Sequence, residues 1–454
     1  MINKTFIDKK VLIFGLGLNQ GGVGCAKFFA SQGAKVKVTD LKSEDVLKPS
    51  LEQLKEIHNI EYSLGGHKNE DIEWADLIIQ NPSVKPGNPY MDYAKKQGKE
   101  IETDFSIFLN FANQKKIIAV TGTKGKSTTA SLIYEALKEA GKKVVFAGNI
   151  GKSILDTIPY LKEDPWIVVE ISSFQLQALK DKNFAPKVAV ITNIYPDHLN
   201  WHSSMEEYIE AKKEIAKNQT RTDFLIIPCG DSGGRRAAKD LTTGIKSKII
   251  TSCIGDFEEE YLNIDLPLKG YAYRENYSLA LTVTETLGIN DKVTLKAFSA
   301  FKGGEFRMQT MGDFNGITII NDSAATNPVS IISAIEASSD KKNIILIAGG
   351  MNKGLEYHEV AAAIETAKSI KLVYFLEGDA SKEIAKYIRD TAIIGGKGFY
   401  NDLVNLLKEI KKEAREGDTI LFSPGATSFN LFQNEFDRGR KFNEAVEKIF
   451  KSKP

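Results

Sequence analysis

The sequence has few cysteines, and their spacing argues against two kinds of site. Only three occur in 454 residues, Cys25, Cys229 and Cys253, and they lie far apart along the chain. A disulfide framework needs paired cysteines, and a structural zinc site needs closely spaced ones. We therefore expect no disulfide framework, no zinc site and a reducing, cytoplasmic location.

Long apolar runs and a charge excess are also missing. No stretch approaches the roughly 20 apolar residues that cross a bilayer, and the first ten residues contain no apolar signal core. Lys and Arg number 60 against 59 Asp and Glu, a formal net charge of +1. Such a balance gives no general attraction to nucleic acid. We expect no export, no membrane insertion and no nucleic-acid partner.

What the sequence does contain is a repeated alternation of short apolar runs with longer amphipathic ones. This rhythm is typical of βαβ units, in which helices cover a parallel sheet. The predicted strands are Val11–Phe14, Lys35–Thr39, Leu77–Ile79, Ile117–Val120, Val144–Ala147, Ile167–Glu170, Val188–Thr192, Ile317–Ile320, Ile344–Ala348, Leu372–Phe375 and Thr419–Phe422. The sequence therefore predicts an α/β protein with mainly parallel sheets.

Two breaks in this pattern divide the chain into three expected domains. A polar segment at 111–115 and a Gly-Gly pair at 303–304 each precede a new strand. A chain of 454 residues also exceeds the roughly 250–300 residues that one hydrophobic core supports. We expect three domains, over residues 1–112, 113–308 and 309–454.

One glycine-rich segment has the composition of a phosphate-binding loop. The sequence Thr121-Gly-Thr-Lys-Gly-Lys-Ser-Thr128 follows a β-branched run and precedes a helix-forming one, which is the order that a P-loop requires. Lys126 is expected to neutralise phosphate charge and Ser127 to ligate Mg²⁺. Val120 replaces the outer glycine of the standard pattern, so this loop is a shortened variant. The predicted ATP contacts are Gly122, Thr123, Lys124, Gly125, Lys126, Ser127 and Thr128.

Residues suited to a metal site follow this loop. Glu170 ends a buried-looking strand, where a carboxylate without a partner is costly, and P-loop enzymes use such a carboxylate to complete an Mg²⁺ site. His198 follows another strand, where it is either a metal ligand or a hydrogen-bonded surface group. Lys212 lies on the next amphipathic helix, where lysines are usually solvated. Spacing alone leaves the roles of His198 and Lys212 open.

The first domain carries a weak dinucleotide-binding pattern. A glycine-rich turn follows Val11–Phe14, and the acidic Asp40 follows the next apolar run. These features are typical of Rossmann domains, so an NAD(P)-dependent oxidoreductase is an alternative function. That alternative assigns no function to the glycine-rich loop at 121–128.

Several motifs, in their order and spacing, resemble the Mur ligases over essentially the whole chain. The central ones are residues 121–128, Glu170–Leu176, Thr192–Leu199 and Tyr208–Lys212. Residues 321–327 and 423–439 resemble the members that add D-glutamate to UDP-N-acetylmuramoyl-L-alanine. The resemblance implies an ATP- and Mg²⁺-dependent ligase of peptidoglycan precursor synthesis. In this reaction a UDP-sugar peptide carboxylate becomes an acyl phosphate, which D-glutamate then captures.

The resemblance implies a Rossmann-like UDP-sugar-binding domain over residues 1–112, a central ATP-binding domain over 113–308 and a C-terminal Rossmann-like domain over 309–454 that binds the amino acid and nucleotide. It also implies individual roles. The catalytic residues would be Lys126, His198 and Lys212. Two Mg²⁺ ions would be held by Ser127, Glu170, His198 and Lys212, the last as a carbamate. ATP would also contact Asn276, Arg307 and Asp322. The substrates would contact Leu18, Asn19, Asp40, Asn149, Ser172, Thr326, Lys353 and Ser428. The enzyme is expected to be a monomer that acts on small molecules.

Some positions depart from the family pattern. Ala324 replaces a lysine, and Ala272 and Tyr273 replace a His-Asn pair. Phe306 replaces a histidine before arginine, and Glu435 stands where an aromatic residue is expected. A Mur-type ligase with another acceptor amino acid is therefore one alternative. A folylpolyglutamate synthetase-like ligase is a second, which the UDP-type first domain disfavours, and a non-catalytic nucleotide-binding module is a third.

Overall fold

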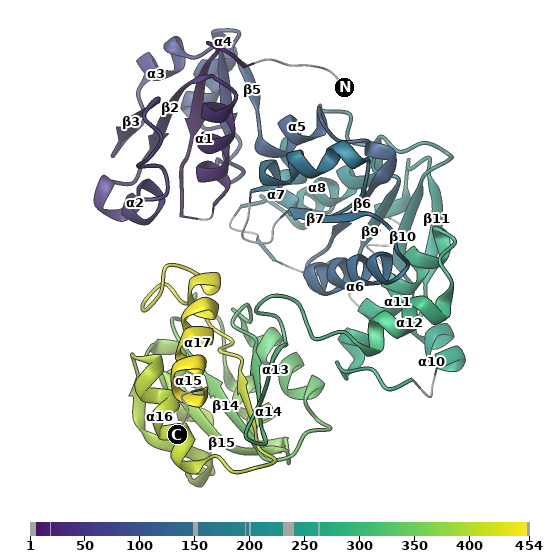
Figure 1. The fold of residues 1–454 in the computed structure, drawn as a ribbon, viewed down its shortest axis with the longest axis vertical. Coiled ribbons are helices and arrows are strands. Elements are labelled where there is room, and N and C mark those ends of the chain that lie inside the picture. The colour runs from purple at the N-terminus through teal and green to yellow at the C-terminus, as the bar shows by residue number, and fades with distance from the viewer. Residues whose placement is uncertain are drawn as a thin grey trace. The chain divides into compact units, whose positions relative to one another are not determined.

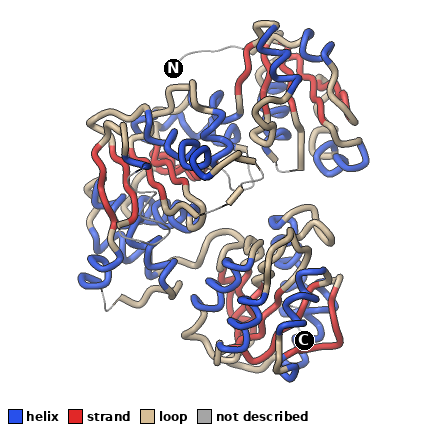
Figure 2. Tube along the Cα trace, turned by 180° about the vertical axis from the view of Figure 1, so that it is seen from behind, coloured by secondary structure: helices blue, strands red, loops and turns tan. Residues whose placement is uncertain are grey.

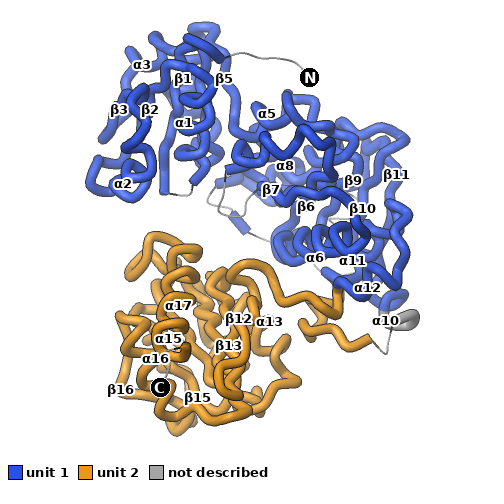
Figure 3. Tube along the Cα trace, viewed as in Figure 1, with its two compact units in different colours: residues 1–262, 275–297 blue, residues 263–274, 298–454 orange. Residues whose placement is uncertain are grey.

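The chain folds into two compact units, which Figure 3 distinguishes by colour. The computed structural model describes residues 6–18, 20–148, 153–195, 197–198, 201–229, 240–261 and 264–451. Unit 1 comprises residues 1–262 and 275–297, and unit 2 comprises residues 263–274 and 298–454. Strands form the interior of both units and helices cover them (Figure 2). Within the described ranges, no helix is long and apolar enough to span a membrane.

Unit 1 begins with a five-stranded parallel sheet in the strand order β3-β2-β1-β4-β5. Its elements are β1 (Lys10–Phe14), α1 (Gly21–Ser31), β2 (Lys35–Asp40), α2 (Glu44–Leu51), β3 (Ile60–Leu64), α3 (Asn69–Trp74), β4 (Leu77–Gln80), α4 (Pro89–Lys96), β5 (Glu100–Glu102) and α5 (Asp104–Leu109). The strand order reverses between β1 and β4. Open α/β sheets bind ligands at this reversal, beside the carboxyl end of the central strand.

A second sheet in unit 1 has six parallel strands in the order β11-β10-β9-β6-β8-β7. Figure 1 labels β6, β7, β9, β10 and β11 of this sheet. The elements are η1 (Gln114–Lys116), β6 (Ile117–Thr121), α6 (Lys126–Glu139), β7 (Val144–Gly148), η2 (Ile154–Glu163), β8 (Trp166–Glu170), α7 (Ser173–Ala178), β9 (Val188–Ile191), α8 (Met205–Lys217), β10 (Phe224–Pro228), β11 (Lys248–Ser252), α10 (Ile254–Tyr261), α11 (Tyr271–Thr286) and α12 (Asp291–Ser299). The central strands β6 and β9 are buried at every residue, as expected where helices cover both faces.

Unit 2 contains a six-stranded sheet in the order β12-β13-β17-β14-β15-β16. Only the β12–β13 pairing is antiparallel. The elements are β12 (Gln309–Phe314), β13 (Ile317–Asn321), α13 (Pro328–Ala337), β14 (Ile344–Ala348), α14 (His358–Thr366), β15 (Ile370–Leu376), α15 (Asp379–Tyr387), η3 (Thr391–Ile393), β16 (Ile394–Tyr400), α16 (Leu403–Glu413), β17 (Thr419–Phe422) and α17 (Glu435–Phe450). Its core packs aliphatic and aromatic side chains from the sheet against α16 and α17.

The predicted α/β class with mainly parallel sheets is confirmed. Every predicted strand overlaps an observed one, whereas β3, β5, β10, β11, β12 and β16 were not predicted. The three sheets fall within the three expected domains. The expected domain boundaries at residues 112 and 308 remain predictions.

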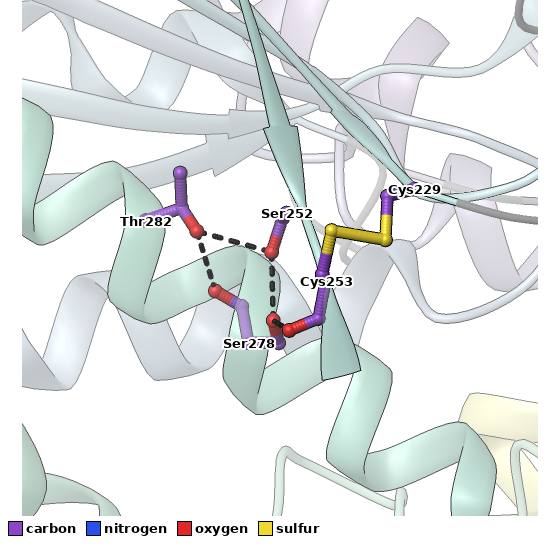
Figure 4. Close-up of a disulfide and its surroundings, with 5 residues drawn as sticks. All are labelled: Cys229, Ser252, Cys253, Ser278 and Thr282. Atoms are coloured by element: carbon purple, nitrogen blue, oxygen red, sulfur yellow. Dashed lines mark hydrogen bonds between the residues drawn. A yellow bond between two sulfur atoms is a disulfide. The ribbon is translucent and has the colours of Figure 1, made fainter. Parts of the chain in front are cut away.

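The expectation that the cysteines do not pair was wrong for two of them. Cys229 and Cys253 form a disulfide although they lie 24 positions apart in the sequence, with their Cα atoms 5.0 Å apart (Figure 4). Pro228 of β10 lies opposite Ser252 of β11 in a parallel register. The next residue on each strand is a cysteine, so the two thiols are brought side by side. Cys25 is free and buried.

Candidate active site

The predicted phosphate loop connects β6 to α6, as a P-loop requires. Gly122 and Gly125 have φ values of 147° and 80°, which favour glycine. A Cβ atom on Gly122 would lie 1.9 Å from Thr192 Oγ1, and one on Gly125 would lie 2.3 Å from Asn276 Oδ1. The loop therefore depends on both glycines. It ends at the N-terminus of a 14-residue helix, whose partial positive charge favours an anion.

Residues that follow β9 hold the loop in place. Asn193 Oδ1 accepts a hydrogen bond from Lys124 N at 2.8 Å, and Asn193 Nδ2 donates to Lys124 O at 3.1 Å. Thr192 Oγ1 also donates to Lys124 O, and Thr123 N donates to Asn193 O at 2.9 Å. Sequence reasoning did not assign these functions to Thr192 and Asn193. Their only signal was their place in a polar loop directly after a buried strand.

Gly122→Ala is expected to weaken ATP binding by about fivefold or more, because the new Cβ displaces Thr192 from the loop. A strained backbone of this kind costs about 1–3 kcal/mol, and 1.4 kcal/mol is tenfold in affinity. The matched control is Gly141→Ala, because Gly141 has a φ of 67° but no atom within 4 Å of an added Cβ. Titration with a fluorescent ATP analogue compares the two. Equal affinities would show that the loop tolerates a side chain.

Ser127 and Glu170, the two residues predicted to hold the first Mg²⁺, lie in contact. Ser127, in the first turn of α6, donates from Oγ to Glu170 Oε2 at 2.5 Å. Glu170 ends β8 and is 1% exposed. Lys126 folds back over the loop and donates to Gly122 O and Thr123 O, both at 3.0 Å. A hydroxyl and a buried carboxylate beside a phosphate loop are oxygen ligands of the kind that Mg²⁺ prefers.

Lys212 on α8 is buried against the same loop. Its side chain is 2% exposed, and its Nζ donates to Gly122 O at 2.8 Å. The Nζ atom also lies 4.6 Å from the ring centre of Tyr208. Burial, and then the charge of Lys126, hold the pKa of Lys212 well below its usual value. The structure thus favours the neutral amine, which is the nucleophilic form.

The ring of His198 lies 6.4 Å from that of Tyr208, which also contacts Lys212. The backbone of His198 is left-handed, with a φ of 56°. Its ring lies 4.9 Å from that of Phe174, and its Nε2 is 3.9 Å from Asp197 Oδ2. Burial lowers the pKa of His198, the Asp197 carboxylate opposes this shift, and Lys126 adds to it. A lowered pKa favours the neutral imidazole, which is the metal-binding form.

Tyr208 links α8 to the phosphate loop. Its hydroxyl lies 3.1 Å from Thr123 Oγ1, and burial raises its pKa to about 12. Thr123 Oγ1 in turn accepts from Tyr195 N at 3.0 Å. The sequence identifies Tyr208 only as part of a family motif and does not predict its contact with the loop. Among the described residues, no group of three or more His, Cys, Asp and Glu is arranged to hold a metal. The predicted set of Mg²⁺ ligands instead includes Ser127 and a modified Lys212.

Asn276 approaches the loop from α11. Its Oδ1 accepts from Thr129 Oγ1 of α6 at 3.2 Å, and it is the side chain that leaves no room for a Cβ on Gly125. The side chain is 4% exposed. The structure therefore places this predicted nucleotide contact beside the phosphate loop.

In the first sheet, Asp40 holds the glycine turn that follows β1. Its Oδ2 accepts from Gly17 N at 2.9 Å and its Oδ1 from Lys42 N at 2.9 Å. Leu18 is half-buried in the same turn. In the central domain, Ser172 caps α7 by accepting from Gln175 N at 3.3 Å. The predicted substrate contacts Asn19 and Asn149 lie outside the described residues.

In unit 2, Asp322 directly follows β13 and is buried. It accepts hydrogen bonds from Ser423 Oγ at 2.7 Å and from Met308 N at 3.0 Å. Burial raises its pKa to about 6, although these hydrogen bonds and the charges of Arg307 and Arg438 oppose the shift. The neighbouring Arg307 is half-buried. The structure therefore places Asp322 and Arg307, both predicted ATP contacts, within electrostatic range of each other.

The raised pKa of Asp322 gives an expected pH dependence. An acid whose folded-state pKa of about 6 exceeds its ordinary value of 3.8 binds more protons when folded, so stability falls as pH rises between these values. The loss for unit 2 reaches about 3 kcal/mol, at 1.36 kcal/mol per pKa unit. Asp322→Asn should remove this part of the pH dependence. Thermal unfolding midpoints from pH 4 to pH 7 provide the measurement, and parallel curves for variant and wild type would contradict the assignment.

Arg438 ties together the two loops that carry the predicted amino-acid contacts. The side chain is completely buried. Its guanidinium donates to Ser323 Oγ at 3.0 Å, Ser323 O at 2.6 Å, Ala325 O at 3.4 Å and Ala426 O at 3.0 Å. Desolvation lowers its pKa to about 10. Arg438 thereby fixes the backbone next to Thr326 on one loop and close to Ser428 on the other.

The remaining predicted contacts lie on these loops and on the loop after β14. Thr326 is half-buried and Lys353 is exposed. Ser428 is 2% exposed, and within the described part of the chain its Oγ has no hydrogen-bond partner. A cavity of about 460 Å³ lies nearby, at the carboxyl ends of β14, β15 and β16. It is lined by Met351, Glu377, Gly378, Asp379, Lys382, Asn401, Asn430 and Leu431.

Three family models match successive parts of the chain. The Mur ligase MurD-like N-terminal domain matches residues 9–103, the Mur ligase middle domain residues 120–316, and the Mur ligase glutamate ligase domain residues 306–425. Together they span the first sheet, the phosphate-loop site and most of unit 2.

Similar proteins belong to the same group. The UDP-N-acetylmuramoylalanine--D-glutamate ligase of Borreliella burgdorferi is 35% identical, over 96% of this chain and 97% of that protein. The ligase of the same name from Clostridioides difficile is 33% identical, over 97% and 99%. The structure of MurC from Thermotoga maritima aligns with a TM-score of 0.61 at 21% identity, over 97% of this chain and 99% of that one. The MurF–ADP complex from the same organism gives 0.57 at 17%, over 99% of each chain. The chain belongs to the Mur ligase family.

Proposed function

We propose that this chain is an ATP-dependent ligase that adds D-glutamate to UDP-N-acetylmuramoyl-L-alanine through an acyl phosphate. The observation that carries the proposal is the cluster around the phosphate loop, in which Lys126, Ser127, Glu170 and Lys212 converge from three elements. The names of the relatives that are about one third identical over nearly the whole chain support the choice of substrate and acceptor. The family match to the first domain disfavours the oxidoreductase alternative.

The first half of the reaction needs stabilisation of charge on the transferred phosphoryl group. ATP would lie on the loop with its phosphates at the N-terminus of α6, and Lys126 would turn from the loop carbonyls to the γ-phosphate. Ser127 and Glu170 would hold Mg²⁺, which supplies further positive charge. The substrate carboxylate then attacks the γ-phosphorus, and ADP leaves. Asn276 would contact the nucleotide from α11.

Lys212 and His198 would hold a second Mg²⁺. For Lys212 this requires a carbamate, formed when its neutral amine adds to CO₂ and releases a proton. The buried position and the lowered pKa of the amine support this step. A carbamate supplies two oxygens and a negative charge in place of a neutral amine. The neutral imidazole of His198 is also suited to bind a cation.

The second half of the reaction would use residues of unit 2. Lys353 supplies a cation, and Thr326 and Ser428 supply hydroxyls, for the carboxylates of D-glutamate. The amino group attacks the acyl carbon, and phosphate leaves. The buried, unpartnered hydroxyl of Ser428, as seen within the described residues, supports its use as a donor. Turnover requires the amino acid to reach the acyl phosphate, so we expect the domains to move during the cycle.

Phosphate release tests the proposal. The purified protein is incubated with ATP, Mg²⁺, UDP-N-acetylmuramoyl-L-alanine and one amino acid from a panel of D- and L-isomers. Release is expected with D-glutamate and not with L-glutamate or when the UDP-sugar is omitted. Release with another amino acid would keep the ligase chemistry but change the acceptor. No release with any acceptor would overturn the proposal.

A further inference from the structure

The disulfide described above has no part in the proposed reaction. Cys229 and Cys253 directly follow the carboxyl ends of β10 and β11. The phosphate loop follows the carboxyl end of β6, which runs parallel to them in the same sheet. In a reducing compartment, a disulfide that is not needed for folding is usually a transient, redox-responsive one. The position of the pair raises the question of what its oxidation state would change.

Hydrogen bonds connect the pair to α11 (Figure 4). Ser252, the residue before Cys253, lies with its Oγ 2.8 Å from Ser278 Oγ and accepts from Thr282 Oγ1 at 3.0 Å. Ser278 Oγ also lies within hydrogen-bond distance of the carbonyl of Cys253, at 3.2 Å. The chain at the disulfide is thus attached to two successive turns of α11 through side chains that are mostly buried.

The same turn of α11 carries Asn276. Asn276 is two residues from Ser278, and its Oδ1 accepts from Thr129 Oγ1 in α6. It also fills the space beside Gly125. A small shift of α11 therefore changes a contact of the phosphate loop, because no free volume separates Asn276 from Gly125. The connection from the cysteines to the loop consists of contiguous hydrogen bonds and packing.

We propose that Cys229 and Cys253 form a reversible oxidation site whose state sets the nucleotide affinity of the phosphate loop. The disulfide holds the end of β11 against β10 and so holds α11 and Asn276 in position. Reduction releases this restraint and is expected to weaken ATP binding by about fivefold or more, the lower end of usual coupling strengths. The inference rests on nucleotide binding at this loop, as in the proposed function.

The oxidant would be a low-molecular-weight disulfide. The thiolate of one cysteine attacks one sulfur of this small disulfide. A mixed disulfide forms between that cysteine and the attacked sulfur, and the other half of the small disulfide leaves as a thiolate. The thiolate of the second cysteine then attacks the sulfur of the first cysteine in this mixed disulfide and expels the second small thiolate. The two protein thiols lose two electrons and two protons in total, and the small disulfide is reduced to two thiols. A dithiol reverses both steps.

The test uses the full-length protein equilibrated at defined ratios of reduced to oxidised glutathione. Alkylation followed by mass spectrometry reports the state of Cys229 and Cys253, and titration with a Mg²⁺-bound, non-hydrolysable ATP analogue reports affinity. We expect both thiols to be protected in the oxidised protein and the affinity to fall by about fivefold or more on reduction. A disulfide that never forms, or equal affinity in both states, would overturn the inference.

Matched variants separate the parts of this inference. Cys229→Ser should bind the analogue as the reduced protein does at every glutathione ratio, whereas Cys25→Ala should respond like wild type. Ser278→Ala should still form the disulfide but reduce the affinity difference, because two of the three hydrogen bonds that link Ser252 and Cys253 to α11 are removed. If Ser278→Ala keeps the full difference, the proposed connection is wrong. Binding without phosphate release would contradict the proposed function alone, and no binding in either state would overturn both.

Discussion

Lys126→Ala is expected to lower the rate of phosphate release by about a thousandfold or more. Its ammonium group already lies over the loop, held at 3.0 Å from the carbonyl oxygens of Gly122 and Thr123. From there it can reach the γ-phosphate, where a cation stabilises the charge that develops on the transferred phosphoryl group. Loss of one such cation from a phosphoryl-transfer site typically costs 10³–10⁵ in rate. Steady-state phosphate release at saturating substrates gives the comparison.

Lys138→Ala is the matched control for this variant. Lys138 belongs to the same helix, α6, but lies in its last turn and pairs with Glu135 on the surface. A surface pair of this kind contributes little to stability, so activity should be unchanged. The unfolding midpoint of Lys126→Ala should stay close to that of wild type. Normal phosphate release by a folded Lys126→Ala protein would show that the phosphate loop does not take part in the reaction.

The strands that could be predicted from the sequence are mainly those in sheet interiors. Strands such as β6 and β9 are buried on both faces, so they read as continuous apolar runs. Among the strands that were missed, β3, β5, β11, β12 and β16 lie at sheet edges. Their sequences mix polar residues with apolar ones because one side faces solvent. β10 is apolar enough to be recognised, and it was missed nonetheless.

The disulfide was not predicted because β10 and β11 were not predicted. The pairing of Cys229 with Cys253 follows directly from the parallel register of β10 and β11. Without those two strands, a sequence separation of 24 residues gave no reason to place the cysteines together. Long-range proximity in a sheet depends on strand order and register, which local residue patterns do not specify.

The candidate site was predictable where each residue has a chemical role that depends on its type. The contact between Ser127 and Glu170 agrees with the predicted metal pair. Residues that support the loop, such as Asn193 and Tyr208, were missed because their roles arise only when distant strands and helices meet. The metal and amino-acid roles themselves stay predictions, since they concern ligands that would bind there and a proposed modification of Lys212.

Lys212→Ala is expected to lower phosphate release by about a hundredfold or more and to recover partly when a short carboxylate such as acetate is added. If Lys212 acts as a carbamate, its removal deletes a negatively charged metal ligand from a buried position, and a small carboxylate can occupy the vacated space. Loss of one electrostatic contact at a reaction centre typically costs 10²–10³ in rate. Phosphate release is measured across a series of acetate concentrations, with chloride at equal ionic strength as the reference.

The neighbouring Lys213 distinguishes this chemistry from a general effect of charge. Lys213 occupies the next position on α8 but pairs with Glu210 at 3.2 Å, so Lys213→Ala should keep its activity and show no response to acetate. Lys212 also donates to Gly122 O, and a purely structural role would therefore lower activity without any rescue. A loss that acetate does not restore would leave Lys212 as a support for the phosphate loop. Wild-type activity in Lys212→Ala would exclude both roles. Rescue specific to Lys212→Ala would be explained by a carboxylate-like ligand, because an ammonium group cannot be replaced by an anion.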